Sequence, residues 1–294
     1  MPYCGPVRIP FRLVDVFTER PLAGNQLCVI PHAPPSLEPT TMQLLAREIG
    51  FSETTFVTET APDRYRMRIF TPGAELPFAG HPTLGTAFVL VSDGMVRSPA
   101  IQEVAAGEIP VEVDVDAGFA WMRQLPPTFG QELRNGGELA RAAGLDPGDL
   151  DRALPPRVVS TGLPHLLVGV RDRAAVARAT MDPPRLTAVV EEAGADGFYL
   201  FALTDDGAQA RFFGPGVGVN EDAATGSAAG PLGAYLAGRG VGGMPGRIVI
   251  RQGREMGRPS ELHVDVRREA ATWEVRVGGG VRIVGRGEFE IPDA

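Results

Sequence analysis

The stretch SETTFV carries a carboxylate in a setting where it could exchange protons. Glu53 stands between a serine and two threonines, at the point where a predicted helix gives way to an apolar strand. A carboxylate directed into a core has a raised pKa, so it can take up and release a proton near neutral pH. Glu53 is therefore a candidate acid/base residue. The alternative is that Glu53 is an ordinary surface carboxylate.

His81 and Asp222 could act beside such a carboxylate. His81 lies in AGHP and Asp222 in EDAATGS, and each segment comes just before or at a predicted helix start. A lone histidine is usually structural, and an aspartate before a helix is usually its N-terminal cap. From the residues alone, the catalytic and the structural interpretations both stay open.

Two glycine-containing segments are candidates for binding an anion. Gly80 comes two residues before Pro82, and Gly226 lies between Thr225 and Ser227. A helix N-terminus has unpaired N–H groups and the positive end of the helix dipole, so it attracts a carboxylate or phosphate. The alternative is that these glycines only allow close packing of a helix on a strand.

The elements behind these segments are two helices that are apolar on nearly every side, over residues 82–92 and 227–238. Such a helix cannot lie on a surface, so each must be wrapped by strands. MRIFTPG precedes the first helix and ARFFGPG the second, which makes the halves look like copies of one unit.

We therefore predict an α+β fold of two similar lobes, each a strand-rich, barrel-like sheet around a central apolar helix. The N-terminal lobe is expected over residues 1–128, with the C-terminal strand as a candidate to return to it. The C-terminal lobe is expected over residues 129–294, and the active site in the cleft between the two lobes.

Composition excludes several classes of function. The 294 residues carry a net charge of −8, which is opposite to the basic footprint of a nucleic-acid binder. All 28 basic residues are arginine, so a pyridoxal phosphate Schiff base, a Schiff-base aldolase and a Walker A site, which each need a lysine, are ruled out. No apolar run approaches the roughly 18–20 residues of a membrane span, and no signal-peptide pattern begins the chain. We expect a cytoplasmic protein without a nucleic-acid or membrane partner.

Two cysteines, Cys4 and Cys28, are too few for a disulfide framework and show no spacing typical of metal ligands. We expect Cys4 to be a mobile terminal thiol and Cys28 a core residue. With one histidine near the candidate residues and no paired cysteines, no metal site is predicted there.

Taken together, the motifs resemble the PhzF family of phenazine biosynthesis. The likeness extends from about Val14 to the C-terminal GRGEFEI, and it is carried by DVFTERPLAGN, SETTFV, RIFTPGAELPFAGHPTLGTA, NEDAATGSAAGPL and QGREMGRPS. The resemblance implies a diaminopimelate epimerase-like fold, a homodimer, and an isomerase that needs no cofactor. The phenazine enzyme of this family isomerises trans-2,3-dihydro-3-hydroxyanthranilate.

The resemblance also assigns roles. The family's acid/base glutamate falls on Glu53, its histidine on His81, and its aspartate and serine on Asp222 and Ser227. The substrate-binding candidates are Ser52, Gly80, Thr225, Gly226 and Ser227, which would hold a small-molecule carboxylate. One departure is the turn GNQ, where the family has GNP, so Gln26 puts the local backbone shape in doubt.

Related epimerases and racemases use two cysteines, one at each helix start, and the matching positions here are Ala79 and Ala223. Neither alanine can act as a base, so the resemblance favours isomerisation by one glutamate over racemisation by two bases. Two alternatives stay open: a same-fold isomerase or epimerase of another small acid, and a small-acid-binding protein without catalytic activity.

Overall fold

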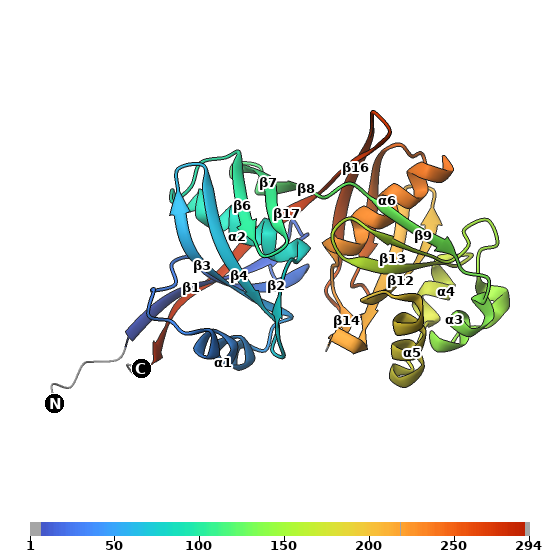
Figure 1. The fold of residues 1–294 in the computed structure, drawn as a ribbon, viewed down its shortest axis with the longest axis horizontal. Coiled ribbons are helices and arrows are strands. Elements are labelled where there is room, and N and C mark those ends of the chain that lie inside the picture. Colours follow the sequence, from blue (N-terminus) through green and yellow to red (C-terminus); the bar gives the residue numbers. More distant parts are fainter. Residues whose placement is uncertain (1–6, 218, 292–294) are drawn as a thin grey trace. The chain divides into compact units, whose positions relative to one another are not determined.

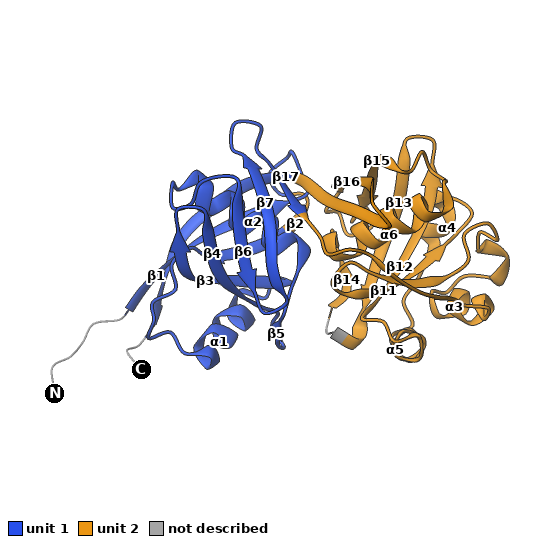
Figure 2. Ribbon diagram, turned by 45° about the horizontal axis from the view of Figure 1, so that its top comes forward, with its two compact units in different colours: residues 1–22, 26–122, 280–294 blue, residues 23–25, 123–279 orange. Residues whose placement is uncertain are grey.

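The computed structural model describes residues 7–217 and 219–291, and the chain divides into two compact units (Figure 2). Unit 1 comprises residues 1–22, 26–122 and 280–294, and unit 2 comprises residues 23–25 and 123–279. The chain passes from unit 1 into unit 2 after Met122, whereas the sequence analysis predicted the boundary between the lobes after residue 128. The C-terminal segment from residue 280 belongs to unit 1. Cys4 lies outside the described residues.

Unit 1 is built from strands that surround one helix (Figure 1). Its elements are β1 (Val7–Val16), β2 (Asn25–Ile30), α1 (Pro39–Ile49), β3 (Glu53–Ala61), β4 (Arg64–Phe70), β5 (Glu75–Leu76), α2 (Gly80–Ser92), β6 (Ala100–Val104), β7 (Gly107–Asp114), β8 (Phe119–Arg123) and the second part of β17 (Thr272–Ile291). The strands pair in the closed order β1, β2, β3, β4, β6, β7, β8, β17 and back to β1.

Unit 2 follows the same plan. Its elements are β9 (Thr128–Glu132), α3 (Gly136–Ala142), η1 (Pro147–Asp149), β10 (Arg157–Ser160), β11 (Pro164–Gly169), α4 (Arg173–Arg178), α5 (Pro183–Ala193), β12 (Gly197–Thr204), β13 (Gly207–Gly214), η2 (Pro215–Val217), β14 (Val219–Asp222), α6 (Gly226–Arg239), β15 (Gly246–Gln252), β16 (Ser260–Glu269) and the first part of β17. The strands pair in the order β9, β10, β11, β12, β13, β15, β16, β17.

The two units are structural repeats. In unit 1, β2 and β3 are parallel, β3 and β4 form an antiparallel hairpin, and α2 connects β4 to the parallel strand β6. In unit 2, β11 and β12 are parallel, β12 and β13 form the hairpin, and α6 connects β13 to the parallel strand β15. This confirms the predicted fold class of two similar, strand-rich units, each around a central apolar helix.

Small residues allow the strands to approach the central helices. Nearly all of α2 and α6 is buried, including their glycines. A Cβ atom added at Gly85 in α2 would lie 2.6 Å from the Leu27 side chain, and one added at Gly233 in α6 would lie 2.5 Å from the Val264 side chain. Glycine at these two positions is therefore required by the packing of β2 and β16 on the helices.

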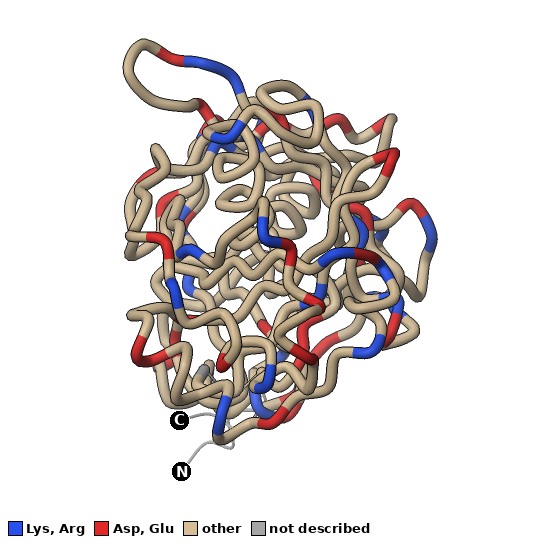
Figure 3. Tube along the Cα trace, turned by 90° about the vertical axis from the view of Figure 1, so that its right-hand side faces the viewer, with Lys and Arg blue, Asp and Glu red and all other residues tan. Residues whose placement is uncertain are grey.

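Charged residues lie mainly on the strands and loops outside these cores. Figure 3 shows acidic and basic positions interspersed along the chain. Within the described ranges, no helix is long and apolar enough to cross a membrane.

Candidate active site

In unit 1, Glu53 and His81 lie together at the start of β3 and the first turn of α2. The side chain of Glu53 is 13% exposed and that of His81 is 4% exposed. The His81 Nε2 atom lies 3.3 Å from Glu53 Oε2 and 3.2 Å from the backbone oxygen of Gln26. Gly80 is the first residue of α2, directly before His81.

The Gln26 carbonyl fixes which ring nitrogen of His81 carries a proton. A carbonyl oxygen only accepts hydrogen bonds, so Nε2 must donate its N–H to it. Glu53 Oε2 is buried and accepts no hydrogen bond of good geometry from any residue of the described ranges. Gln26, where this sequence departs from the family's turn, contacts His81 through its backbone carbonyl. Every residue type has this carbonyl, so the contact does not depend on the side chain at position 26.

Burial controls the acidity of Glu53. Loss of solvent raises the pKa of this carboxyl from 4.5 to about 7, and a hydrogen bond from the Ser52 side chain opposes the rise in part. A carboxyl with a pKa near the working pH can both take a proton and return it. The raised pKa fits the predicted acid/base role of Glu53, and that role stays a prediction.

In unit 2, Asp222 and Thr225 lie at the end of β14 and at the N-cap of α6. The Asp222 carboxylate accepts a hydrogen bond from Thr225 Oγ1 at 2.6 Å and another from Asn25 Nδ2 at 2.7 Å. Asn25 also donates to the Ala224 carbonyl at 3.0 Å. Both carboxylate oxygens are thus held by protein donors, which gives Asp222 a defined orientation.

Gln252, at the end of β15, holds the same loop from its other side. Its Nε2 group donates to the Asp222 carbonyl at 2.8 Å and to Thr225 Oγ1 at 3.0 Å. Its Oε1 atom accepts from the Thr225 amide at 3.2 Å and from the Tyr199 hydroxyl at 3.0 Å. Gln252 is the first residue of QGREMGRPS, so this motif supports the start of α6.

Ser227 follows Gly226 in the first turn of α6 and contacts a histidine that sequence reasoning missed. His165 Nε2 lies 3.1 Å from Ser227 Oγ, and His165 is only 2% exposed. An isolated histidine in an apolar strand looks like an ordinary core residue. The signal available in the sequence was the repeat itself, because aligning the halves places PHLLVG of β11 beside the site.

The strand register defines which residues of the two repeats correspond. Glu53 pairs with Leu27 across β2 and β3, and Gly197 pairs with His165 across β11 and β12. Each pair stands at the first residue of the hairpin strand that precedes α2 or α6. Gly197 therefore occupies the place of Glu53, and unit 2 has no carboxylate there.

The helix starts correspond in the same way. Ala79 is the N-cap of α2 and Thr225 the N-cap of α6, so His81 and Ser227 are both the second residue of their helix. By this measure Ala79 corresponds to Thr225, and Ala223 lies two residues further from the helix. Among the described residues Cys28 is the free cysteine, and it is buried in the core of unit 1.

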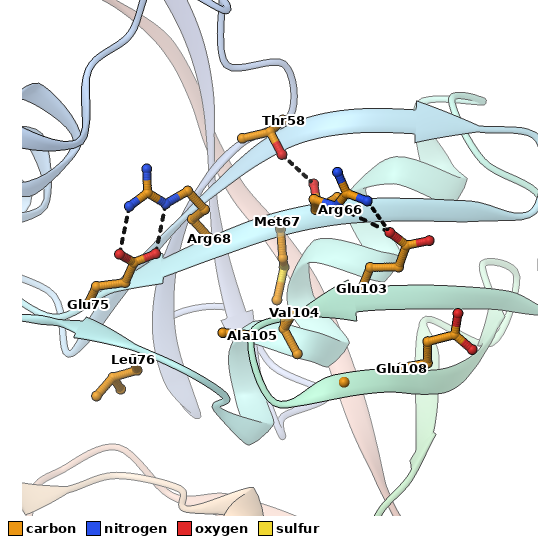
Figure 4. A pocket seen from close by; sticks show the side chains of 11 residues that line it. Thr58, Arg66, Met67, Arg68, Glu75, Leu76, Glu103, Val104, Ala105 and Glu108 are labelled. Atoms are coloured by element: carbon orange, nitrogen blue, oxygen red, sulfur yellow. Dashed lines mark hydrogen bonds and ion pairs between the residues drawn. The ribbon is translucent and has the colours of Figure 1, made fainter.

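A separate groove of about 580 Å³ lies on unit 1, over β4 to β7 (Figure 4). Its charged side chains are paired: Arg66 contacts Glu103 at 2.8 Å, and Arg68 contacts Glu75 at 2.6 Å. None of the sequence-predicted site residues lines this groove. Across residues 7–217 and 219–291, no cluster of three or more His, Cys, Asp or Glu side chains could hold a metal ion.

The fold and the comparisons with known proteins define the class as an isomerase of diaminopimelate epimerase-like fold. A family model described as phenazine biosynthesis-like protein, PhzC-PhzF, matches residues 14–287, and the chain belongs to this family.

Relatives and solved structures agree with this membership. The trans-2,3-dihydro-3-hydroxyanthranilate isomerase of Pseudomonas chlororaphis is 37% identical over 282 residues, covering 94% of this chain and 97% of the relative. An uncharacterized isomerase of Deinococcus radiodurans is 37% identical over 279 residues, covering 90% of each chain. The crystal structure of a Bacillus anthracis PhzF family protein has a TM-score of 0.88 at 29% identity, covering 97% of this chain and 100% of that one.

Proposed function

We propose that this isomerase shifts a proton between two carbons of a small, conjugated carboxylate, with Glu53 as the proton carrier. The first candidate substrate is trans-2,3-dihydro-3-hydroxyanthranilate, the compound in the name of the Pseudomonas chlororaphis relative. The observation that carries the proposal is Glu53 itself, a largely buried carboxyl whose pKa is raised to about 7 beside the N–H of His81.

The proposed reaction uses a single carboxylate. Glu53 removes a proton from an activated C–H bond, and the electron pair delocalises into the conjugated system of the substrate. The protonated Glu53 then returns the proton to a different carbon, so no net proton is gained or lost. The presence of Gly197 at the corresponding place in unit 2 supports a one-base shift over a two-base inversion.

The remaining candidates would bind and orient the substrate. We assign the substrate carboxylate to the first turn of α6, where Ser227 offers a hydroxyl and Gly226 a backbone N–H that no intrahelical acceptor uses. We assign the amino and hydroxyl substituents to His81 and Asp222. General acid–base catalysis contributes about 10²–10⁴-fold, so orientation and the helix dipole must supply the rest of the rate enhancement.

The experiment is turnover of trans-2,3-dihydro-3-hydroxyanthranilate in deuterium oxide by the wild type and by Glu53→Gln. The wild type is expected to form product that carries solvent deuterium, and the variant to lose at least about 10²-fold in kcat, as expected for removing the acid/base group. Ser227→Ala serves as the matched comparison and should raise KM more than it lowers kcat. Undiminished kcat in Glu53→Gln would overturn the assignment.

A second candidate is a related isomerisation of another small acid. It is favoured by the Deinococcus radiodurans relative, which is as similar in sequence and has no assigned substrate. Deuterium exchange into a panel of small unsaturated acids separates the two candidates, because a Glu53-dependent exchange would identify the acid. Absence of exchange across the whole panel would instead support a binding protein without catalytic activity.

We also propose a homodimer, as the family resemblance implies. Light scattering coupled to size-exclusion chromatography measures it directly. A mass of about twice the 31.2 kDa of one chain is expected, and a mass of one chain would contradict the proposal.

A further inference from the structure

His165 has the environment of a positioning residue for Ser227. It comes from β11, its ring packs edge-to-face on Phe212 at a centroid distance of 5.4 Å, and its Nε2 atom faces Ser227 Oγ. The side chain has almost no solvent contact. Its burial lowers the pKa of the imidazole to about 3, so the ring is neutral at any working pH and cannot serve as a proton carrier.

The other ring nitrogen is the informative atom. His165 Nδ1 is buried and has no hydrogen-bond partner among residues 7–217 and 219–291. It faces the backbone of Gly197, where an added Cβ atom would lie only 3.3 Å away. A neutral imidazole carries one proton, on one of its two nitrogens. A proton on Nδ1 would leave a buried N–H donor without an acceptor, which native structures rarely contain.

The proton therefore belongs on Nε2, and this choice sets the direction of the hydrogen bond. Nε2–H donates to Ser227 Oγ, whose lone pair accepts it. The Ser227 hydroxyl hydrogen is then not used by His165. It remains available for an acceptor atom of a ligand, next to the unused N–H groups of the first turn of α6.

We propose that His165 is a positioning residue that makes the Ser227 hydroxyl a hydrogen-bond donor, so that this end of α6 selects a carboxylate oxygen and disfavours an ammonium group. The inference rests on the proposed function for its ligand, trans-2,3-dihydro-3-hydroxyanthranilate. The statement about the proton on His165 concerns the protein alone.

The strand register offers a substitution that the fold should accept. His165 stands where unit 1 has Leu27, so His165→Leu places in β11 the residue that the repeat already uses. His165→Gln keeps an N–H donor near the position of Nε2 and tests rescue. His32, which is exposed, provides the control variant His32→Gln.

The first measurement is the tautomer, by nitrogen NMR of histidine-labelled protein, with the His165 signals assigned from their absence in His165→Leu. We expect the Nε2–H tautomer and no titration from about pH 5 to about pH 9. An Nδ1–H tautomer would overturn the proposal. This result does not depend on any substrate, so it separates a failure of this inference from a failure of the proposed function.

The second measurement is a double-mutant cycle in steady-state kinetics with trans-2,3-dihydro-3-hydroxyanthranilate. His165→Leu is expected to raise KM about tenfold with a smaller change in kcat, the scale of one hydrogen bond to a charged group. His165→Gln should recover part of the loss, and His32→Gln should match the wild type. In a Ser227→Ala background His165→Leu should have little further effect, because it acts through that hydroxyl. Additive effects of the two substitutions would overturn the proposal.

Discussion

The raised pKa of Glu53 results from its burial and not from a charged neighbour. Most carboxylates of this chain with shifted pKa values are paired with arginine, as Glu103 is with Arg66, and their pKa values are lowered. Glu53 has no arginine partner in the described ranges, and burial raises its pKa instead. That difference separates a carboxyl that can exchange protons at neutral pH from those that only carry charge.

The raised pKa predicts the pH profile of turnover. As the proposed base, Glu53 must be deprotonated to remove a C–H proton, so kcat/KM should rise with pH and level off above an apparent pKa of about 7. Steady-state rates from about pH 5 to about pH 9 measure it. A profile that is already flat at pH 5 would show that the base in free enzyme is a group of ordinary carboxyl acidity.

The stability of the fold should also depend on the protonation of Glu53, and it should fall as the pH rises, whereas turnover increases. Because the folded-state pKa is above that of the unfolded chain, the native state holds the extra proton between about pH 4.5 and pH 7. The contribution of Glu53 to stability is therefore present at low pH and is lost as the pH rises through about 7. At pH 8 the free energy of unfolding of Glu53→Gln, measured with denaturant, should exceed that of the wild type by on the order of 2–3 kcal/mol. Near pH 4 the two proteins should be equally stable.

The control for this measurement is Glu59→Gln, whose carboxylate is exposed and paired with Arg66 on the surface of unit 1. Surface ion pairs contribute about 0–1 kcal/mol, so little change is expected at either pH. A Glu53→Gln variant that is less stable than the wild type at pH 8 would contradict the burial argument.

At the scale of elements, the central helices and the repeat were predictable and the supports of the site were not. A helix that is apolar on all sides has to be enclosed by strands. The Pro-Gly turn that recurs in both halves marks the segment before each of these helices. Asn25 and Asp222, by contrast, meet across 197 residues of sequence. No local pattern encodes such a contact. His165 was missed for the same reason, because its partner Ser227 lies in another element.

The packing of α6 predicts opposite effects for two glycine substitutions in the same helix. Gly233→Ala should destabilise by about 1–3 kcal/mol, because its new Cβ would press on Val264. Gly238→Ala should leave stability unchanged or raise it by up to about 1 kcal/mol, since nothing lies within 4 Å of an added Cβ there and alanine favours a helix. Thermal or denaturant unfolding measures both, and equal effects would contradict the assigned packing.

At the scale of the whole molecule, the long strand β17 is shared between the two units. Up to Gly279 it belongs to unit 2, and from Gly280 it belongs to unit 1. Its last residues pair with β1, with Val7 opposite Ile291, and the Phe289 ring packs on Phe11. The sequence showed a strand-rich C-terminus, but the apolar alternation of a strand does not reveal which partner it pairs with.

Removing residues 280–294 should therefore open unit 1. β1 would lose β17, one of the two strands it pairs with, and the cluster that contains Cys28 would lose Phe289 and Ile291. In the native state burial raises the pKa of the Cys28 thiol to about 12, so it should resist a thiol reagent. With Cys4→Ser as background, the shortened chain should react rapidly and the full-length chain slowly. Equal protection would show that unit 1 does not need this strand.

The glycine that stands in unit 2 where unit 1 has Glu53 also bears on stereochemistry. If Glu53 is the single proton carrier, as proposed, it can approach a planar intermediate from one face alone. Each new C–H bond then forms with a single handedness, and the mirror-image product is not made. Inversion of a centre needs one group to remove the proton on one face and another to supply it on the opposite face. With Gly197 in that place we predict a product of one handedness, which chiral analysis measures, and a racemic product would contradict the single proton carrier.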